Sequence, residues 1–366
     1  MSKLIVHVIT TLNPNGAERL VVELLCQLKA QGFDCRLITL FKVPDGILAE
    51  KLKRAQIFHV CIGGTNWWEI NLFFKLRVLL KRWNPGVIHS HLFPPEYLVP
   101  LAAPHGVPLL HTEHSVSNRR RKYPIARMVE SILYQKYKFI ICISSGVCCS
   151  LKSWVPGMKR KLVVVENGVD LTKFRMRTGI IDRSVFNLPV KAPVICMIGR
   201  FEMPPKDQSA IIRALEYLPD VHLVLAGAGP DHSKLVQLAK ICRVEERVHF
   251  PGYIENVNEL LSCIDVYIYS SFHEGFGLAV IEAMAAGIPV IASDVNALNT
   301  LVDHEVNGLL FKQGDIPGLA QSIKRVLDDE RLRTRLIDNG RTTSDNYSFD
   351  KMVKKYVAIY EEQFKT

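Results

Sequence analysis

The chain has no apolar run long enough to cross a lipid bilayer, because its longest candidates, such as Phe139 to Ile143, are far shorter than the roughly 18 residues that a membrane-spanning helix needs. The nine cysteines contain no C-x-x-C pair, which disfavours a metal-binding ribbon or a disulfide framework. No G-x-G-x-x-G segment opens a helix directly after a strand, so Gly227 and Gly229 are weak support for a dinucleotide-dependent oxidoreductase. These absences predict a cytoplasmic globular protein with reduced thiols.

The net charge of +10 is concentrated in the first half of the chain. Residues 1 to 175 contain 25 lysines and arginines against 11 acids, a balance of +14, and the remainder has 21 against 25, a balance of −4. A basic half favours an anionic membrane surface or a phosphorylated acceptor as partner. Nucleic acid is disfavoured because no helix-turn-helix, zinc finger or aromatic stacking pattern accompanies the charge. A basic face that is merely solvated remains the alternative.

Short β-branched runs alternate with segments of helical period, which predicts βαβ units and parallel sheets buried on both faces. Six strands are expected in a first domain of residues 1–175: Ile5 to Thr10, Cys35 to Leu40, Gly86 to Ser90, Pro108 to His111, Phe139 to Ile143 and Val163 to Val165. A second domain of residues 190–347 restarts the pattern with Val194 to Ile198, Val221 to Ala226, Val248 to Phe250, Val266 to Tyr269 and Pro289 to Ala292. The fold class is therefore α/β, with two doubly wound Rossmann-like domains whose strand ends are expected to face each other across a cleft.

Residues 348–366 follow the second domain but are expected to pack on the first. Phe349 to Phe364 has the period of an amphipathic helix, with Met352, Val353, Tyr356, Val357 and Tyr360 on one face. An apolar stripe of this kind needs a partner surface, and the first domain is the expected one.

The loop after Val266 to Tyr269 is the most informative segment. It places Glu274 at the carboxyl end of a strand, and Gly275 and Gly277 remove side chains from the start of the following helix. Bare amides at a helix amino end bind anions such as a diphosphate, whereas a carboxylate beside them suits the hydroxyls of a sugar or ribose. The alternative is that Glu274 caps the helix and that Glu282 is a surface residue.

This segment does not stand alone. Motifs in the same order along nearly the whole chain resemble the GT4 family of retaining glycosyltransferases, which have the GT-B fold: Asn15-Gly16-Ala17-Glu18-Arg19, Asn167-Gly168-Val169-Asp170 with Phe174, Ile198-Gly199-Arg200 with Lys206, Leu225-Ala226-Gly227-Ala228-Gly229-Pro230, Pro251-Gly252-Tyr253, Glu274-Gly275-Phe276-Gly277-Leu278 with Glu282, and Glu305-Val306-Asn307-Gly308-Leu309-Leu310. The resemblance implies a metal-independent, retaining hexosyltransferase that needs no cofactor.

The resemblance also assigns roles to residues of the second domain. Arg200 and Lys206 would hold the donor diphosphate, where two cations stabilise a leaving group that gains negative charge. The amides of Phe276, Gly277 and Leu278 would add to this anion site. Glu274 would contact the donor sugar and Glu282 the ribose. The family commonly has Lys-Gly where this chain has Lys206-Asp207 after two prolines, which puts the reach of the lysine in question.

In the first domain, the resemblance assigns Gly16 to the donor phosphate or the acceptor and His114 to the donor sugar. The family usually has two glycines at the first of these positions, and Asn15 replaces one of them. His91, Arg119 and Arg120 are expected on the acceptor side. His89 and His111 are expected to be packed core histidines, because no Cys or Asp completes a metal site with the four histidines.

No second carboxylate is evident to act as a nucleophile, so the resemblance implies front-face transfer in which the leaving diphosphate helps to deprotonate the acceptor. The expected donor is a UDP-sugar, and the expected acceptor is a saccharide, lipid-linked at the inner face of the cytoplasmic membrane, in lipopolysaccharide or cell-surface polysaccharide biosynthesis. A sugar-nucleotide epimerase or hydrolase of the same fold, or an inactive binding module, are the alternatives.

Overall fold

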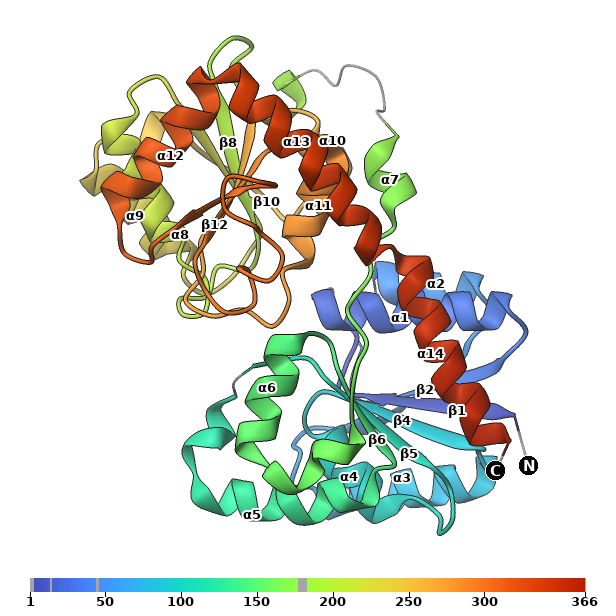
Figure 1. Cartoon of the computed structure of the whole chain (residues 1–366). Helices are drawn as coiled ribbons and strands as arrows, with labels where there is room; N and C mark the ends of the chain where they lie inside the picture. Colours follow the sequence, from blue (N-terminus) through green and yellow to red (C-terminus); the bar gives the residue numbers. More distant parts are fainter. Residues whose placement is uncertain (1–2, 14, 44–45, 117, 177–182, 366) are drawn as a thin grey trace. The chain divides into compact units, whose positions relative to one another are not determined.

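The computed structural model describes residues 3–13, 15–43, 46–116, 118–176 and 183–365. They form two compact units: Met1–Asn167 with Asp350–Thr366, and Gly168–Phe349 (Figure 1). The division falls at Asn167 rather than after residue 175, because Val169 pairs with Ser348 and helix α7 (Leu171–Arg175) contacts helix α11 (Leu278–Ala286).

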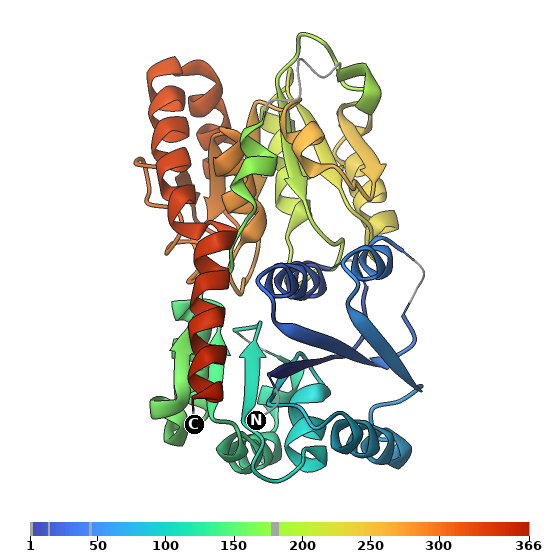
Figure 2. The ribbon, with the colours of Figure 1, turned by 90° about the vertical axis from the view of Figure 1, so that its right-hand side faces the viewer.

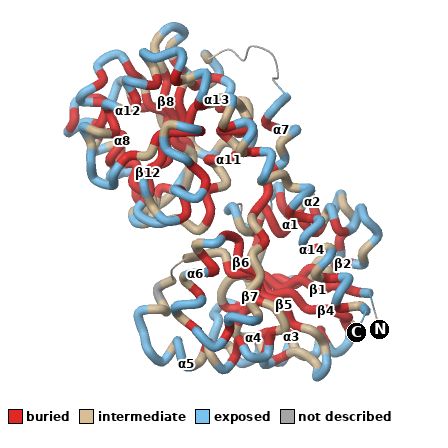
Figure 3. Tube along the Cα trace, viewed as in Figure 1, coloured by how far each residue is buried: buried red, intermediate tan, exposed pale blue. Residues whose placement is uncertain are grey.

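A seven-stranded parallel sheet in the order β3-β2-β1-β4-β5-β6-β7 forms the centre of the first unit. Its strands are β1 Leu4–Ile9, β2 Asp34–Phe41, β3 Phe58–Gly64, β4 Val87–His91, β5 Leu109–Glu113, β6 Phe139–Cys142 and β7 Leu162–Val164. Helices cover both faces of the sheet, so every residue of β1, β4 and β5 is buried. Figure 3 shows these strands as the buried centre of the unit.

The helices of the first unit are α1 Gly16–Ala30, α2 Ile47–Arg54, α3 Ile70–Trp83, α4 Pro95–Ala102, α5 Pro124–Leu133, α6 Ser145–Trp154 and α14 Phe349–Phe364. Figure 1 shows α1 and α2 on one face of the sheet and α3, α4 and α5 on the other. Helix α14 begins and ends where its periodicity predicts, and it buries Met352, Val353, Tyr356 and Tyr360 but only half of Val357. It lies along the first unit (Figure 2), where the Tyr360 hydroxyl contacts Nδ1 of His89 at 2.6 Å.

The second unit is built around a six-stranded parallel sheet in the order β10-β9-β8-β11-β12-β13. Its strands are β8 Val194–Ile198, β9 His222–Ala226, β10 Val248–Gly252, β11 Val266–Tyr269, β12 Val290–Ser293 and β13 Leu309–Phe311. Besides α7 and α11, its helices are α8 Gln208–Ala214, α9 His232–Ile241, α10 Val257–Leu261, α12 Ile316–Asp328 and α13 Glu330–Ser344. Parallel strands separated by helices confirm the predicted α/β class.

Two edge strands were not expected from the sequence. Among the described residues strand β3 pairs only with β2, and only Ile62 and Gly64 of its residues are buried, so the continuous apolar run that identifies a central strand is missing. Strand β13 pairs only with β12 and is three residues long. Edge strands need less apolar sequence because one side of each is not covered by another strand.

In both sheets the strand order reverses beside the first strand of the unit. Strand β1 lies between β2 and β4, and strand β8 lies between β9 and β11. Ligands of doubly wound sheets bind at such reversal points, beyond the carboxyl ends of the strands. Ligand-binding residues are therefore expected on the loops after β1, β4, β8 and β11.

None of the described helices is both long and apolar enough to cross a membrane. All nine cysteines are free, and Cys61 and Cys149 are the exposed ones.

Candidate active site

The loops after β8 and β11 are joined by backbone hydrogen bonds at the reversal point of the second sheet. The amide of Asp207 donates to Ser270 O at 3.1 Å, and the amide of Phe272 donates to Pro205 O at 2.8 Å. The Asp207 side chain also accepts from the amide of Ala210 at the start of α8. These bonds fix Lys206 opposite the segment that carries Glu274.

Lys206 and Glu274 form an ion pair, with Nζ 2.5 Å from Oε2. Their side chains are only 14% and 19% exposed, so the pair is largely removed from solvent. The two prolines before Lys206 do not prevent this contact. Lys206 also donates to the Tyr269 hydroxyl, and that hydroxyl donates to Glu274 Oε2 at 2.7 Å.

Glu274 is held in its ionised form. Burial by itself would raise its pKa, but the charge and hydrogen bond of Lys206, the Tyr269 hydroxyl and the Gly275 amide together hold the pKa of Glu274 below its ordinary value. Burial and the charge of Glu274 raise the pKa of Tyr269, with a smaller contribution from Glu282. Tyr269 is therefore a neutral hydrogen-bond donor to an anionic carboxylate.

The amino end of α11 follows directly after this carboxylate. Gly277 has φ +107°, and a Cβ there would lie 2.9 Å from the Leu298 side chain, so glycine is required. No side chain caps this helix start among the described residues. Phe276 is buried against Tyr347, with ring centroids 5.5 Å apart, and Leu278 is the first helical residue. Glu282 lies half-buried in the middle of α11.

Arg200 lies two residues beyond β8, and its side chain is 58% exposed. Its Nε is 3.1 Å from Glu202 Oε2, which is a solvent-accessible contact of small energetic weight. The guanidinium can exchange this partner for a phosphate, but no contact among the described residues tests that role, which stays a prediction.

Gly227 and Gly229 serve close packing beside Arg200. A Cβ on Gly227 would lie 2.0 Å from Gly199 O, and one on Gly229 would lie 2.3 Å from Phe201 O. This packing accounts for the glycines without a dinucleotide.

In the first unit, His91 ends β4 and His114 follows β5, with ring centroids 5.8 Å apart. Burial lowers the pKa of His114 to about 3, with a smaller effect of His111. Burial likewise lowers the pKa of His91. Both rings are neutral at physiological pH, and among the described residues neither His114 Nε2 nor His91 Nδ1 has a hydrogen-bond partner. Neutral rings with an unused nitrogen suit sugar hydroxyls.

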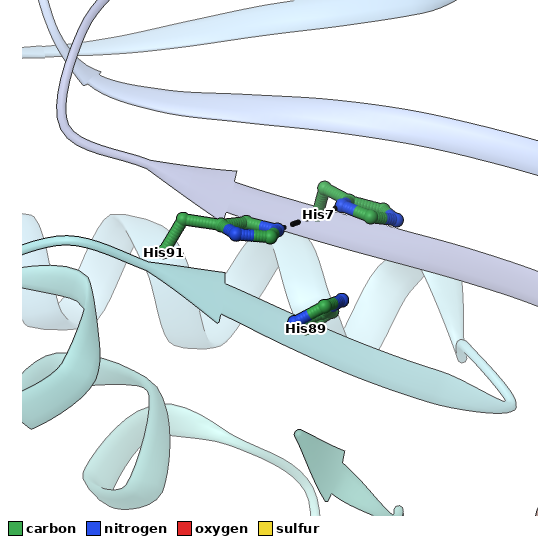
Figure 4. Close-up of side chains that lie close together, drawn as sticks. All are labelled: His7, His89 and His91. Atoms are coloured by element: carbon green, nitrogen blue, oxygen red, sulfur yellow. Dashed lines mark hydrogen bonds between the residues drawn. The ribbon is translucent and has the colours of Figure 1, made fainter. Parts of the chain in front are cut away.

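His7 joins this group from β1, which the sequence did not suggest. His7 Nδ1 lies 3.0 Å from His91 Nε2 (Figure 4), and the Tyr360 hydroxyl lies 3.3 Å from His7 Nε2. His89 is buried, as expected, and its ring nitrogens contact Tyr360 at 2.6 Å and Thr112 at 2.8 Å. Register explains the grouping, since His7 is paired with His89 across β1 and β4.

Two groups of side chains in the first unit are close enough to hold a metal ion: His7, His89 and His91, and Glu96, His111 and Glu113. In the first group, hydrogen bonds already use both ring nitrogens of His7 and His89. In the second, Arg120 pairs with Glu96 and Arg121 pairs with Glu113. Internal hydrogen bonds and ion pairs therefore account for most of the polar atoms of both groups, and His91 Nδ1 is left without a partner among the described residues.

Arg120 lies between two buried carboxylates, Glu96 and Glu130, and stacks over the Phe93 ring at 4.2 Å. The Tyr97 hydroxyl and the Trp154 indole also donate to Glu130, at 2.7 and 2.6 Å. This network neutralises charge that would otherwise be costly to bury. An acceptor role for Arg120 stays a prediction, and the Arg119 side chain lies outside the described residues.

Gly16 is the first residue of α1, directly after the turn that follows β1. Asn15, which replaces a family glycine, adopts an extended conformation and donates from Nδ2 to Glu18 Oε1 at 3.1 Å. The asparagine therefore links the turn to the first turn of the helix.

Residues 14–173 match the Glycosyltransferase Family 4 model, and residues 180–343 match the model for glycosyl transferases group 1. The chain is 30% identical over 348 residues to the lipopolysaccharide core biosynthesis glycosyltransferase LpsD of Rhizobium meliloti, which covers 94% of this chain and 95% of LpsD. The chain belongs to the GT4 family of glycosyltransferases.

Two further relatives differ in how much of their length is matched. LpsE of the same bacterium is 32% identical over 204 residues, which is 56% of this chain and only 58% of LpsE. An Escherichia coli relative, UDP-Gal:alpha-D-GlcNAc-diphosphoundecaprenol alpha-1,3-galactosyltransferase, is 25% identical over 94% of this chain and 93% of its own.

The solved structure of Anabaena HepE in complex with UDP and glucose superimposes with a TM-score of 0.87 at 20% identity, covering 98% of this chain and 99% of HepE. The present chain therefore has the predicted GT-B fold, with one seven-stranded and one six-stranded parallel sheet in α/β units.

Sequence reasoning overlooked Tyr269, because a tyrosine at the end of a buried strand resembles core packing. Its hydroxyl orients Glu274, so we expect Tyr269→Phe to lower kcat about tenfold, as expected for a lost hydrogen bond to a charged group, with little change in KM for the donor. The acid limb of the pH–rate profile should move to higher pH, because the hydroxyl lowers the pKa of Glu274.

The matched control is Tyr267→Phe on the same strand, whose buried hydroxyl contacts Ile198 only at 3.4 Å. Equal losses in the two variants, with an unmoved acid limb in Tyr269→Phe, would show that Tyr269 acts only in packing.

Proposed function

We propose that this GT4 glycosyltransferase transfers a hexose, with retention of anomeric configuration, from a UDP-sugar to a hydroxyl of a lipid-linked saccharide. The observation that carries the proposal is the ionised Glu274, held by Lys206 and Tyr269 immediately before the uncapped amino end of α11. The carboxylate suits donor hydroxyls, and the helix amino end suits the diphosphate.

Lys206 has the capacity to contact Glu274 and the donor together. An ammonium group has three N–H donors, and two of them are used by Glu274 and Tyr269. The third is available to a phosphate oxygen. With Arg200 two residues beyond β8, the site would supply two cations to the leaving diphosphate, which is why we propose transfer without a metal.

His114 is proposed to accept or donate a hydrogen bond at a donor hydroxyl, because its ring is neutral and its Nε2 lacks a partner among the described residues. Glu282 is proposed to contact the ribose. Transfer would occur on one face of the sugar, with the departing phosphate oxygen taking the acceptor proton, so that no separate base is needed.

The acceptor class is proposed from the relatives and the charge distribution. LpsD and LpsE act in lipopolysaccharide core biosynthesis, and the name of the Escherichia coli relative specifies a diphosphoundecaprenol-linked acceptor. A basic first half fits such an anionic lipid. We therefore propose a role in lipopolysaccharide or cell-surface polysaccharide biosynthesis, peripheral to the inner face of the cytoplasmic membrane.

UDP is expected to stabilise the protein against heat by about 2.7 kcal/mol at a hundredfold excess over its dissociation constant. For a unit of this size, each kcal/mol raises the melting temperature by about 2–4 °C. Differential scanning calorimetry with UDP, GDP and ADP at equal concentrations measures the effect. A shift with GDP alone would change the donor base, and no shift with any of them would refute the donor site.

Product analysis with and without acceptor separates transfer from its alternatives. We expect consumption of UDP-sugar to depend on the saccharide acceptor, and the anomeric proton coupling of the product to match that of the donor. Acceptor-independent isomerised sugar would instead identify an epimerase.

A further inference from the structure

Helix α5 presents its apolar side to solvent. Ile125, Met128 and Ile132 recur at helical spacing and are 67%, 59% and 61% exposed. The opposite side of the same helix buries Glu130, which Arg120, Tyr97 and Trp154 contact. A surface helix normally has the reverse arrangement, with its apolar stripe facing the core.

Helix α3 repeats this feature. Ile70, Phe74 and Val78 lie four residues apart and are 69%, 54% and 66% exposed, while Leu72, Leu76 and Leu80 bury the other side. Trp68, just before the helix, is 67% exposed. Two helices of one unit thus each present an exposed apolar stripe to solvent.

The two stripes belong to one layer of the first unit. Helix α4 contacts both α3 and α5, and Figure 1 shows the three helices on the same face of the sheet. At one end of the layer, the ring of Trp67 lies 5.2 Å from that of Phe93, over which Arg120 stacks. We call Ile70, Phe74, Val78, Ile125, Met128 and Ile132 the α3–α5 face.

The exposed charges on the helices of the α3–α5 face are basic, and one partly exposed acid, Glu69, lies immediately before α3. Helices α3, α4 and α5 are described throughout, and their only acids, Glu96 and Glu130, are buried and paired. Their exposed charged residues are all basic: Lys75, Lys81, Arg82 and Arg127. Apolar side chains interspersed with exposed cations are complementary to a lipid bilayer, in which apolar acyl chains lie beneath anionic headgroups.

We propose that the α3–α5 face docks on a membrane that contains anionic phospholipid. The aliphatic and aromatic side chains enter the boundary between headgroups and acyl chains, and the lysines and arginines contact the phosphates. Trp68 and the 62% exposed Tyr123 add the amphipathic rings that favour this boundary. A protein partner is the weaker match, because interface centres are depleted of lysine.

Docking by this face would also position the acceptor. Three contacting side chains, Trp67, Phe93 and Arg120, lie on the segments that follow β3, β4 and β5. These segments leave the sheet at the same edge as His91 and His114. A lipid-linked saccharide would thus be held near that edge. This consequence rests on the proposed function, whereas the docking itself does not.

The experiment compares flotation of the full chain with vesicles of phosphatidylcholine and with vesicles that also contain phosphatidylglycerol. We expect binding to the anionic vesicles, weakened by salt. The double variant Met128→Ser, Ile132→Ser should lower the partition coefficient about tenfold or more, because two side chains lose their burial in the lipid. The matched control replaces Val190 and Ile241, which are 77% and 69% exposed in the second unit, by serine and should bind like the wild type.

Equal binding by the α5 variant and the wild type would overturn the proposal, as would equal losses in the α5 variant and the control, or absence of wild-type binding. A dimer, detected by sedimentation, that the α5 variant abolishes without a change in vesicle binding would assign the face to a second copy of the chain instead. Stabilisation by UDP is measured on every variant. If it persists while the wild type ignores vesicles, the docking proposal fails and the transferase proposal stands.

Discussion

Lys206→Ala is expected to lower kcat by about 10²–10³-fold, the loss typical when one group that stabilises transition-state charge is removed. Lys206 contacts Glu274 and has one further donor for the leaving phosphate, so its removal affects the charge balance of the reacting groups. Initial rates at saturating donor and acceptor measure the effect, and calorimetry verifies that the variant folds.

Lys234→Ala is the matched control for this variant. Lys234 also forms an ion pair in the second unit, with Asp231 at 2.6 Å, but its side chain is 72% exposed and it lies on α9. Turnover should be unchanged. If Lys206→Ala and Glu274→Ala both retained wild-type turnover, the proposed site would be wrong.

Lowering the pH from 7 to 5 is expected to remove about 4 kcal/mol from the unfolding free energy of the first unit through His7 and His114 alone. The pKa of His7 and of His114 is about 3 when folded and 6.5 for the free side chain, in each case chiefly because of burial. Between these values the unfolded chain binds more protons, so stability is lost as the pH falls. Each histidine contributes about 1.4 kcal/mol per pH unit below 6.5.

Other groups of the first unit change this total. Burial also lowers the pKa of His89 and His91, which adds to the loss of stability in acid. Burial raises the pKa of Glu113, so that carboxyl acts in the opposite direction. All four tryptophans of the chain, Trp67, Trp68, Trp83 and Trp154, lie in this unit. Urea unfolding followed by tryptophan fluorescence at pH 5, 6 and 7 therefore reports on it selectively.

His114→Gln should reduce the slope of the unfolding free energy with pH by about 1.4 kcal/mol per unit, because one buried titrating ring is removed. His105→Gln, at an exposed position, is its control. A stability that does not change between pH 7 and 5 would contradict the buried, neutral state of these histidines.

The strands of both sheet centres were predictable because burial on both faces demands continuous apolar sequence. β1, β8 and β11 all meet that demand. Helix α14 was predictable from its period. Strand β3 was not, because an edge position relaxes the same demand, and strand β13 was not, because its apolar run is only three residues long.

In the candidate site, likewise, some features could be predicted from local sequence and others could not. Local chemistry alone indicates that Glu274 precedes a helix amino end, because the strand, the carboxylate and the glycines are adjacent in sequence. The partner of Glu274 is not local: Lys206 lies 68 residues away, and only the adjacency of β8 and β11 brings them together. His7 and His91, 84 residues apart, meet because β1 pairs with β4.

The sequence by itself determined the GT4 resemblance, the α/β class and the types of residue at the strand ends. Tertiary structure alone decided that Tyr269 orients Glu274, that Arg120 compensates two buried carboxylates, and that α3 and α5 present apolar stripes to solvent. The physical reason is the distance along the sequence over which each feature is encoded. Strand and helix periods record the burial of each element, whereas an ion pair or an uncovered face depends on which elements the sheet order makes neighbours.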